Sequence, residues 1–205
     1  LTAQTAGLLP ALGRRAFFFD GTSVQLASSP ALRQAYPPGS NQHGASHWPL
    51  LRMLVAHDLD TGLAMRPQWG PLNGPRAVSE QQLLEDSIDR LPPEALVVGD
   101  ANFGVFSVAY AASQRGHAVL LRLTAQRAQR LAGGGWRDGI DRRITWRPTR
   151  HDRKTHPRLP QDACVRGRLL VCQVQPSNQA APFLVALFTT WDADQKLILE
   201  VYGRR

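Results

Sequence analysis

Cysteine is nearly absent from this 205-residue sequence, which contains only Cys164 and Cys172. Two cysteines make neither a disulfide framework nor a zinc site, and both fall on an expected strand, where they serve as small apolar residues. Such usage is typical of a reducing, cytoplasmic setting. Long apolar runs are absent as well. None approaches the roughly 20 residues that a membrane span requires, so no membrane partner is expected.

Several functional motifs are also missing. The Gly-rich stretches "GPLNGPR" and "AGGGW" lack the Lys-Ser/Thr ending of a P-loop, which argues against nucleotide binding. His43 and His47 are four positions apart, but they lie in a loop rich in Gly and Ser and not on an expected helix. A zinc pair is therefore not expected. The first residues, "LTAQTAGLLPALGRR", lack the basic-then-apolar order of a signal peptide.

Lysine is as rare as cysteine, and arginine takes its place. The chain has 24 basic and 16 acidic residues, a net charge of +8, and only Lys154 and Lys196 are lysines. The codon usage of a GC-rich genome accounts for part of this bias but not for the excess of positive charge. That excess favours an anionic partner such as nucleic acid. Between Trp136 and Arg158 the chain holds eight basic and three acidic residues.

Apolar patterns predict the secondary structure. Residues 94–124 are expected to form a strand, a helix and a strand, which is a βαβ unit, and Ser79 is the expected N-cap of the helix before it. A long loop rich in Pro, Gly and Ser is expected over 27–47. The other strands are expected at 16–20, 48–58, 63–70, 164–175 and 181–190, and a last helix at 192–205.

Two expected strands end in the same way, "FFFDG" at Asp20 and "LVVGD" at Asp100. If these strands are neighbours in one sheet, the two carboxylates emerge side by side and repel each other unless a proton or a cation lies between them. Carboxylate oxygens suit Mg²⁺, and two such ions clamp the attacking and leaving oxygens of a phosphoryl transfer. The alternative is that each Asp is an ordinary turn residue, since Asp beside Gly is common in turns.

The order of several motifs extends this interpretation. The segments "FDGTS", "WPLLRMLVAHDLDTGLAMRPQWG", "SEQQLLEDSID", "LVVGDANFG", "AVLLRLT" and "ILEVYGRR" follow one another from about residue 14 to the C-terminus. In this order they resemble the DDE transposases of bacterial insertion sequences, specifically the hairpin-forming group with a Tyr-x2-Arg-x3-Glu signature. The resemblance implies an α/β fold, with an RNase H-like mixed sheet flanked by helices and an inserted, mostly β subdomain before the last helix.

The same resemblance divides the chain into three segments. Residues 14–124 hold the first part of the RNase H-like catalytic core, and residues 125–182 are the basic, mostly β insertion. Residues 183–205 supply the last core strand and the truncated start of a C-terminal helix.

Carried over residue by residue, the resemblance makes Asp20 and Asp100 the first two catalytic, metal-binding carboxylates. The implied cofactor is a pair of Mg²⁺ ions, with Mn²⁺ as a substitute. Tyr202 and Arg205 match the Tyr and Arg of the signature, so the catalytic Glu is expected four positions after Arg205, past the end of this chain. The chain alone is then expected to lack its third acid. Glu200 precedes Tyr202 by two positions and is interpreted as an exposed helix residue.

The partner that the resemblance implies is double-stranded DNA, at transposon ends and target, bound by a homodimer in a synaptic complex. The implied location is the bacterial cytoplasm, at the nucleoid. Hairpin-forming relatives stack a flipped base on an aromatic side chain, for which Phe183, Trp146 and Trp191 are the candidates. The basic stretch between Trp136 and Arg158 is either a DNA-binding surface or a solvated loop of a basic protein. The expected DNA contacts are Arg122, Arg142, Arg143, Arg147, Arg150, Lys154, Tyr202 and Arg205.

The expected function is that of a DNA transposase catalytic domain. It would cleave phosphodiester bonds and transfer strands at transposon ends in a metal-dependent reaction of DNA transposition and recombination. Two alternatives stay open. A stand-alone RNase H-like nuclease would cut DNA without joining it, and a non-catalytic DNA-binding remnant of a transposase would keep the fold without the reaction.

Overall fold

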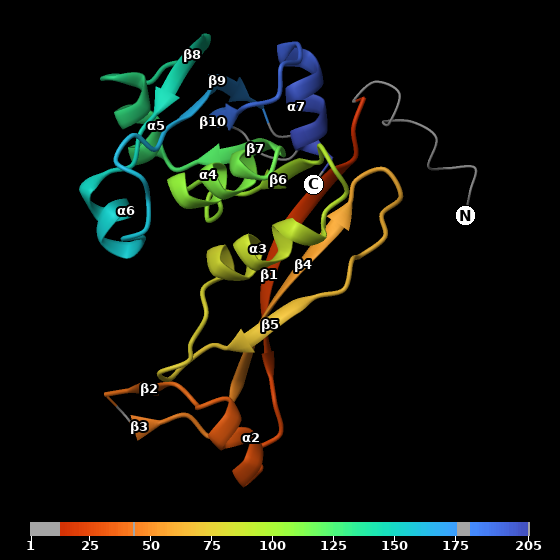
Figure 1. Ribbon diagram of the computed structural model, residues 1–205, viewed down its shortest axis with the longest axis vertical. Helices are drawn as coiled ribbons and strands as arrows, with labels where there is room; N and C mark the ends of the chain where they lie inside the picture. The colour runs from red at the N-terminus through yellow and green to blue at the C-terminus, as the bar shows by residue number, and fades with distance from the viewer. Residues whose placement is uncertain (1–12, 43, 176–180, 205) are drawn as a thin grey trace.

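The structure is a computed structural model that describes residues 13–42, 44–175 and 181–204. Helices flank a large sheet (Figure 1). The strands are β1 (Ala16–Gln25), β2 (Ser40–Asn41), β3 (Gly44–Ala45), β4 (Leu50–Asp58), β5 (Gln68–Pro71), β6 (Leu96–Gly99), β7 (Ala118–Leu123), β8 (Ile140–Trp146), β9 (Val165–Val174) and β10 (Phe183–Thr189). The helices are α2 (Pro30–Ala35), α3 (Glu80–Ser87), the 3-10 turn η1 (Ile88–Arg90), α4 (Phe106–Gln114), α5 (Ala125–Ala132), α6 (Arg150–Thr155) and α7 (Gln195–Gly203).

The large sheet has eight strands in the order β5-β4-β1-β6-β7-β10-β9-β8. β1, β4 and β5 form an antiparallel meander, whereas β6 and β7 lie on the other side of β1 and run parallel to it. Counted along the chain without the small β2–β3 pair, these five strands have the order 3-2-1-4-5, which is the arrangement of RNase H-like folds. The expected fold class is therefore confirmed. The parallel strands β6 and β7, joined by α4, form the expected βαβ unit.

The described part of the segment 125–182 widens this sheet. It contains α5 and α6 as well as β8 and β9, and both strands join the main sheet through β10. The reason lies in β9, whose apolar residues alternate between the two faces. Leu169 and Val171 pack in one core cluster, while Leu170 and Cys172 pack in the other. A strand that is buried on both faces belongs in the interior of a sheet.

Each face of the sheet is covered by different helices. Phe17 and Phe19 of β1 point to the face covered by α3, α4 and α5, which we call the α4 face. Ala16 and Phe18 point to the opposite face, where Tyr202 and other residues of α7 pack, and which we call the α7 face. Successive side chains of a strand point to opposite faces, so this alternation assigns every position of β1 to one face.

The helix boundaries follow the capping signals in the sequence. Ser79 caps α3 as expected, because its Oγ accepts a hydrogen bond from the N–H of Gln82 at 3.1 Å. Gly116, at φ 75°, ends the α4 segment in the left-handed region that favours glycine. Within the described part of the expected loop over 27–47, the structure contains the short helix α2 and the small β2–β3 pair. Among the described residues, no helix is long and apolar enough to cross a membrane.

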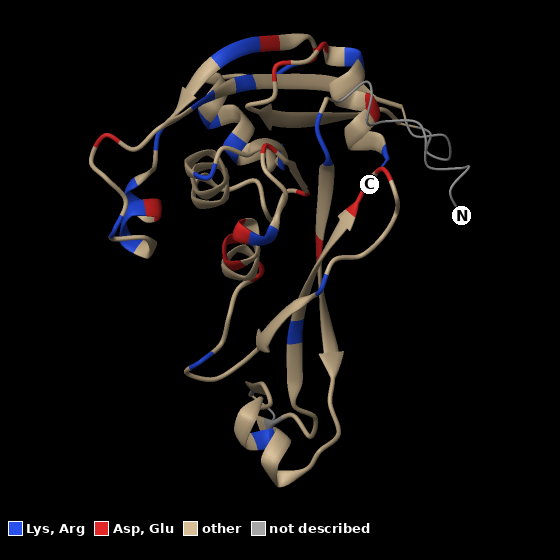
Figure 2. Cartoon of the chain, turned by 45° about the vertical axis from the view of Figure 1, so that its right-hand side comes forward, with Lys and Arg blue, Asp and Glu red and all other residues tan. Residues whose placement is uncertain are grey.

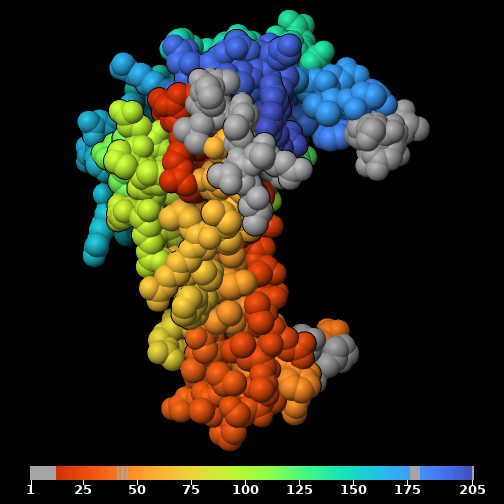
Figure 3. Space-filling view, turned by 90° about the vertical axis from the view of Figure 1, so that its right-hand side faces the viewer, coloured from red at the N-terminus to blue at the C-terminus, as the bar shows by residue number. Residues whose placement is uncertain are grey.

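The β1–β4 ribbon extends beyond the rest of the sheet. β6 pairs with β1 only as far as Phe19, whereas β4 continues alongside β1 to Gln25. With β5 and α2, this ribbon forms an arm, defined here as residues 21–42, 44–55 and 68–71. Lys and Arg gather mainly around β8, β9 and α6, and the arm carries few of them (Figure 2). The arm is the narrow part of the molecule in the space-filling view (Figure 3).

Candidate active site

Asp20 lies inside β1, at the fifth of its ten residues, and not at the end of a strand as its motif predicts. The reason is that β4 pairs with β1 without interruption as far as Gln25. The exposed Asp20 carboxylate accepts a hydrogen bond from the N–H of Gly21, with an N–O distance of 3.0 Å. Asp20 is therefore a side chain on an extended strand, and the turn interpretation is wrong for this residue.

The register of three neighbouring strands brings three of the predicted site residues into one row. β1, β6 and β7 pair in parallel through Phe19, Gly99 and Leu121. Because neighbouring strands are about 4.8 Å apart, the residues that follow these three also lie next to one another. These residues are Asp20, Asp100 and Arg122. We call all three together the acidic row, with Arg122 at its end.

This row belongs to the α7 face. The residues two positions earlier on the three strands are Phe18, Val98 and Leu120, and all of them pack in the core cluster beneath α7. Side chains two apart on a strand share a face, so the row shares it too. Asp20 is exposed, whereas Asp100 and Arg122 are half-buried. The row thus lies at the border between the covered and the open part of this face.

Asp100 is the first residue after β6, and it begins a turn. Its Oδ1 accepts a hydrogen bond from the N–H of Asn102 at 2.8 Å, and its carbonyl accepts one from the N–H of Gly104 at 3.1 Å. A Cβ at Gly104 would lie 1.9 Å from the carbonyl oxygen of Arg122. The turn therefore packs directly on β7, which is why a glycine is required there. For Asp100, a turn position and a place in the row are compatible.

The structure brings two carboxylates together here, not three. In the described part of the chain, no group of three or more His, Cys, Asp or Glu side chains is placed to hold a metal ion. Mg²⁺ is usually bound through one or two carboxylates, with phosphate oxygens of the substrate and water as its other ligands. The oxygen donors of Asp20 and Asp100 fit that mode of binding, in which a nucleic acid completes the coordination.

α7 carries the remaining predicted residues of the C-terminal motif. Tyr202 is 7% exposed and packs in the core, so little of its ring is left to contact DNA. Glu200 is exposed, as expected, and its Oε1 pairs with Nη2 of Arg204 at 2.7 Å. Arg205 lies outside the described residues. Helix α7 therefore packs on the face that holds the row but contributes no described carboxylate to it.

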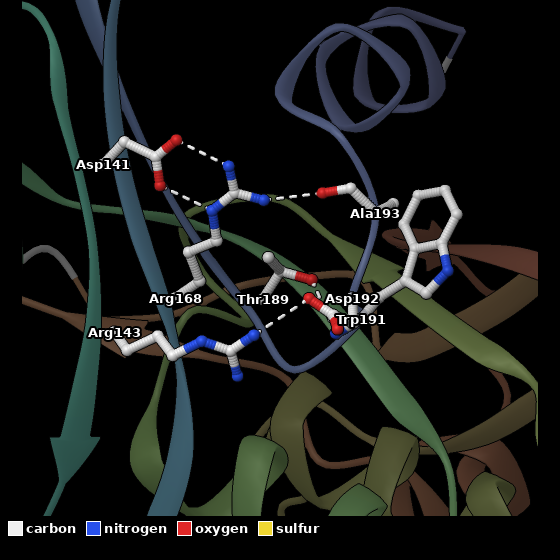
Figure 4. A network of polar contacts seen from close by, with 7 residues as sticks. All are labelled: Asp141, Arg143, Arg168, Thr189, Trp191, Asp192 and Ala193. Atoms are coloured by element: carbon white, nitrogen blue, oxygen red, sulfur yellow. Dashed lines mark hydrogen bonds and ion pairs between the residues drawn. The ribbon is translucent and has the colours of Figure 1, made fainter.

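Two of the predicted DNA contacts, Arg142 and Arg143, lie on β8 and bind other parts of the chain. Arg142 donates hydrogen bonds to the last carbonyls of α5, those of Leu131, at 3.3 Å, and Ala132. Arg143 forms an ion pair with Asp192 at 3.2 Å, although both side chains are 83% exposed (Figure 4). The other predicted basic residues of this segment are exposed and lie in or just before α6; they are Arg147, Arg150 and Lys154.

A second arginine, Arg168, is paired with Arg143 across the strands and binds the segment that precedes α7 (Figure 4). Arg168 on β9 donates two hydrogen bonds to the Asp141 carboxylate, each at 2.5 Å, and a third to the carbonyl of Ala193 at 2.6 Å. The Arg168 hydrogen bonds hold the pKa of Asp141 below its usual range. This network ties β8 and β9 to the segment from which α7 starts, and so helps to keep α7 on its face of the sheet.

Burial excludes two of the three aromatic residues proposed to stack a flipped base. Trp146 and Trp191 are 5% and 6% exposed, and Trp146 lies edge-on to Phe106 and Phe188 in the core. Phe183 is 40% exposed at the start of β10. The polar and charged residues that follow both tryptophans gave no sign that their indoles are buried.

The sequence did not indicate a role for Trp69, yet the structure places it on the α7 face. Thr22 on β1 pairs with Met53 on β4, which pairs with Trp69 on β5. Thr22 is two positions from Asp20 and shares its face, and Trp69 is 48% exposed. An exposed indole and the acidic row thus lie on one continuous sheet surface.

A large cavity in the described part of the chain lies elsewhere. It has a volume of about 1020 Å³ among α3, α4, α5 and α6, and no residue of the row lines it. Burial in this region raises the pKa of Glu85, although a hydrogen bond with Ser107 and the nearby His156 act in the opposite direction. Glu85, Asp86 and Asp152 line this cavity, but none of them is a residue that the sequence motifs single out. We locate the candidate site on the α7 face because Asp20, Asp100 and Arg122 meet there.

Comparisons with known proteins give a limited result. No family model matches the sequence, and no curated protein matches it. A solved structure of a piggyBac transposase synaptic complex with hairpin DNA is similar over 92% of this chain and 37% of that chain, at 10% identity and a TM-score of 0.49. Endonuclease V from Ciona intestinalis, in complex with a 23mer DNA, is similar over 93% of this chain and 76% of that chain, at 9% identity and a TM-score of 0.33. The fold class follows from the order of the strands β5-β4-β1-β6-β7.

Proposed function

We propose that this chain is the catalytic core of an enzyme that cleaves DNA phosphodiester bonds with divalent cations, and specifically of a transposase. The observation that carries the proposal is the row of Asp20, Asp100 and Arg122 across three adjacent strands. Two carboxylates and a guanidinium on one open face match the needs of a phosphate substrate with bound cations. The motif order in the sequence supports a transposase within this class.

The roles of the three side chains follow from their charge. Asp20 and Asp100 would hold Mg²⁺ or Mn²⁺, which when bound supplies Lewis-acid stabilisation of charge on the phosphoryl oxygens. Arg122 carries the complementary positive charge at the same border and would pair with a phosphate oxygen of the DNA backbone. The exposed residues Arg147 and Lys154 extend the positive surface to α6, in keeping with double-stranded DNA as the partner.

The test is metal-dependent DNA cleavage by the full protein. Asp20→Asn and Asp100→Asn should each lower the rate of nicking of a supercoiled plasmid in Mg²⁺ or Mn²⁺ by at least about 100-fold. DNA affinity should stay within about twofold, because the asparagine variants keep the shape and the basic surface. Asp162→Asn, a change at an exposed loop carboxylate, is the matched control and should cleave normally. Normal cleavage by both site variants would refute the assignment.

A transposase and a simple nuclease would both use the acidic row. The two functions are therefore distinguished by their reaction products. A transposase joins the released 3′ end to a second duplex, whereas a stand-alone nuclease leaves only cut ends. A donor fragment with the element's own terminal sequences, incubated with a target plasmid, should yield joined products. Cut ends without joining would favour the nuclease, and binding without either product would favour a non-catalytic remnant.

A further inference from the structure

The first turn of α3 reaches the candidate site from the opposite face of the sheet. Glu80, the first residue of α3, lies over the backbone of Gly21, next to Asp20. A Cβ at Gly21 would lie 2.3 Å from Cδ and 2.6 Å from Oε1 of Glu80. The Glu80 carboxylate therefore occupies the space that any larger residue at position 21 would fill.

The same carboxylate is linked to the turn that carries Asp100. Its Oε2 accepts a hydrogen bond from the Asn102 side-chain amide. Nε2 of Gln81 donates to the backbone carbonyl of Asn102 at 2.9 Å and to its Oδ1 at 2.8 Å. The N–H of Asn102 in turn donates to Oδ1 of Asp100 at 2.8 Å. Asn102 is thus held by α3 on one side and holds Asp100 on the other.

We propose that Glu80 and Asn102 are positioning residues that set the place of Asp100 relative to Asp20; this rests on the proposed function. Glu80 touches β1 beside the first acid and, through Asn102, holds the turn of the second. A cation shared by two carboxylates is sensitive to their spacing, because both must contribute oxygens at about 2.0–2.1 Å. Groups that orient metal ligands typically change metal affinity by about 10–100-fold when they are lost.

The proposal predicts a change in cation affinity without a loss of fold. Glu80→Ala should weaken Mn²⁺ binding by the full protein about 10-fold, as measured by calorimetry. Gly21→Ala should have a similar effect, because the new methyl group displaces the flexible end of Glu80 and leaves the chain of α3 in place. Glu80→Gln keeps an oxygen for the Asn102 amide and should recover most of the affinity. The melting temperature of each variant should change little.

Two comparisons make the outcome decisive. Gln82→Ala changes an exposed residue in the same turn of α3 and should leave Mn²⁺ binding unchanged. If Gly21→Ala and Glu80→Ala lower the melting temperature but not the Mn²⁺ affinity, the contacts only attach α3 to the sheet and the proposal fails. If Asp20→Asn and Asp100→Asn also leave Mn²⁺ affinity and cleavage unchanged, the proposed function itself fails. Should Glu80→Ala not fold, the Gly21→Ala and Glu80→Gln pair carries the test.

Discussion

At the residue scale, Asp58 shows how a buried charge is stabilised at the end of β4. Its side chain is 2% exposed, and its Oδ2 pairs with the guanidinium of Arg15. Oδ1 accepts the N–H groups of Asp60 and Thr61, at 2.9 and 3.4 Å. Burial acts to raise the pKa of Asp58, but the hydrogen bond and charge of Arg15 and the two backbone donors outweigh it and hold the pKa below its ordinary value.

Replacing this carboxylate should destabilise the protein in a pH-dependent way. Asp58→Ala leaves the two backbone N–H groups without their acceptor, which costs about 1–3 kcal/mol at pH 7. A lowered folded-state pKa means that the stabilisation is complete above the unfolded value and is lost as the pH falls through the folded value. Urea unfolding of the wild type and the variant at pH 7 and at pH 3 measures this. A difference in unfolding free energy that does not shrink at pH 3 would contradict the prediction.

The burial of a tryptophan side chain cannot be predicted from its neighbours in the sequence alone. Trp146 and Trp69 both stand near basic or polar residues, yet one is core and the other is half exposed. The difference comes from the strands they occupy. Trp146 on β8 packs against Phe106 and Phe188, whereas Trp69 lies on β5, the edge strand of the sheet, and is 48% exposed.

At the element scale, the predicted DNA contacts of the basic segment fall into two groups, one on β8 and one after it. Arg142 is engaged with the end of α5, where a cation beside the last carbonyls stabilises a helix. Arg147 and Arg150, after β8, are exposed and free to face a ligand. Arg142 is therefore bound within the fold, whereas we propose Arg147 and Arg150 as DNA contacts.

The two groups should respond differently to alanine. Arg147→Ala and Arg150→Ala should each weaken binding to a double-stranded oligonucleotide and reduce the slope of log K against log salt by about 0.9 per lost phosphate contact. Arg142→Ala should instead lower the unfolding free energy by about 0.5–1.5 kcal/mol and leave the salt slope unchanged. Fluorescence anisotropy at several salt concentrations, with urea unfolding alongside, measures both quantities. The reverse pattern would show that Arg142 is the DNA contact.

At the scale of the whole molecule, the arm extends the α7 face beyond the acidic row. β1 runs from the core into the arm (Figure 1). By strand register, Asp20, Thr22 and the cross-strand residues Met53 and Trp69 therefore lie on one surface. DNA that reaches the acids from the side of the arm would pass this surface. The half-exposed indole of Trp69 there offers stacking area to an unpaired base.

Trp69→Ala should therefore weaken binding of DNA with unpaired bases more than binding of a fully paired duplex. Loss of base stacking on one aromatic ring costs about 1–3 kcal/mol, which is roughly a 5- to 150-fold loss of affinity. The fold should tolerate the change, because Trp69 is 48% exposed. Anisotropy with gapped and intact duplexes measures the effect, and Trp48→Ala, at an indole that is 44% exposed, is the matched control. Equal losses for both duplexes would argue against stacking.

The sequence by itself determined most of the elements, because helix and strand patterns depend on residues a few positions apart. The spacing of apolar residues predicted the succession of β6, α4 and β7 within 94–124, and the capping signal at Ser79 predicted where α3 begins. The paired "FFFDG" and "LVVGD" motifs also identified the two acids as unusual. Local patterns missed the length of β1, since its second half contains Gly and small polar residues that form a strand only because β4 pairs with them.

Only the tertiary structure decided which residues meet. Asp20, Asp100 and Arg122 form a row because Phe19, Gly99 and Leu121 pair in parallel, and that register depends on packing between segments far apart in the chain. It also decided that Trp146 and Tyr202 are core residues, that Arg142 is bound to α5, and that Glu80 reaches Gly21. Local sequence encodes the elements, whereas burial and strand register, which are properties of the whole chain, create the site.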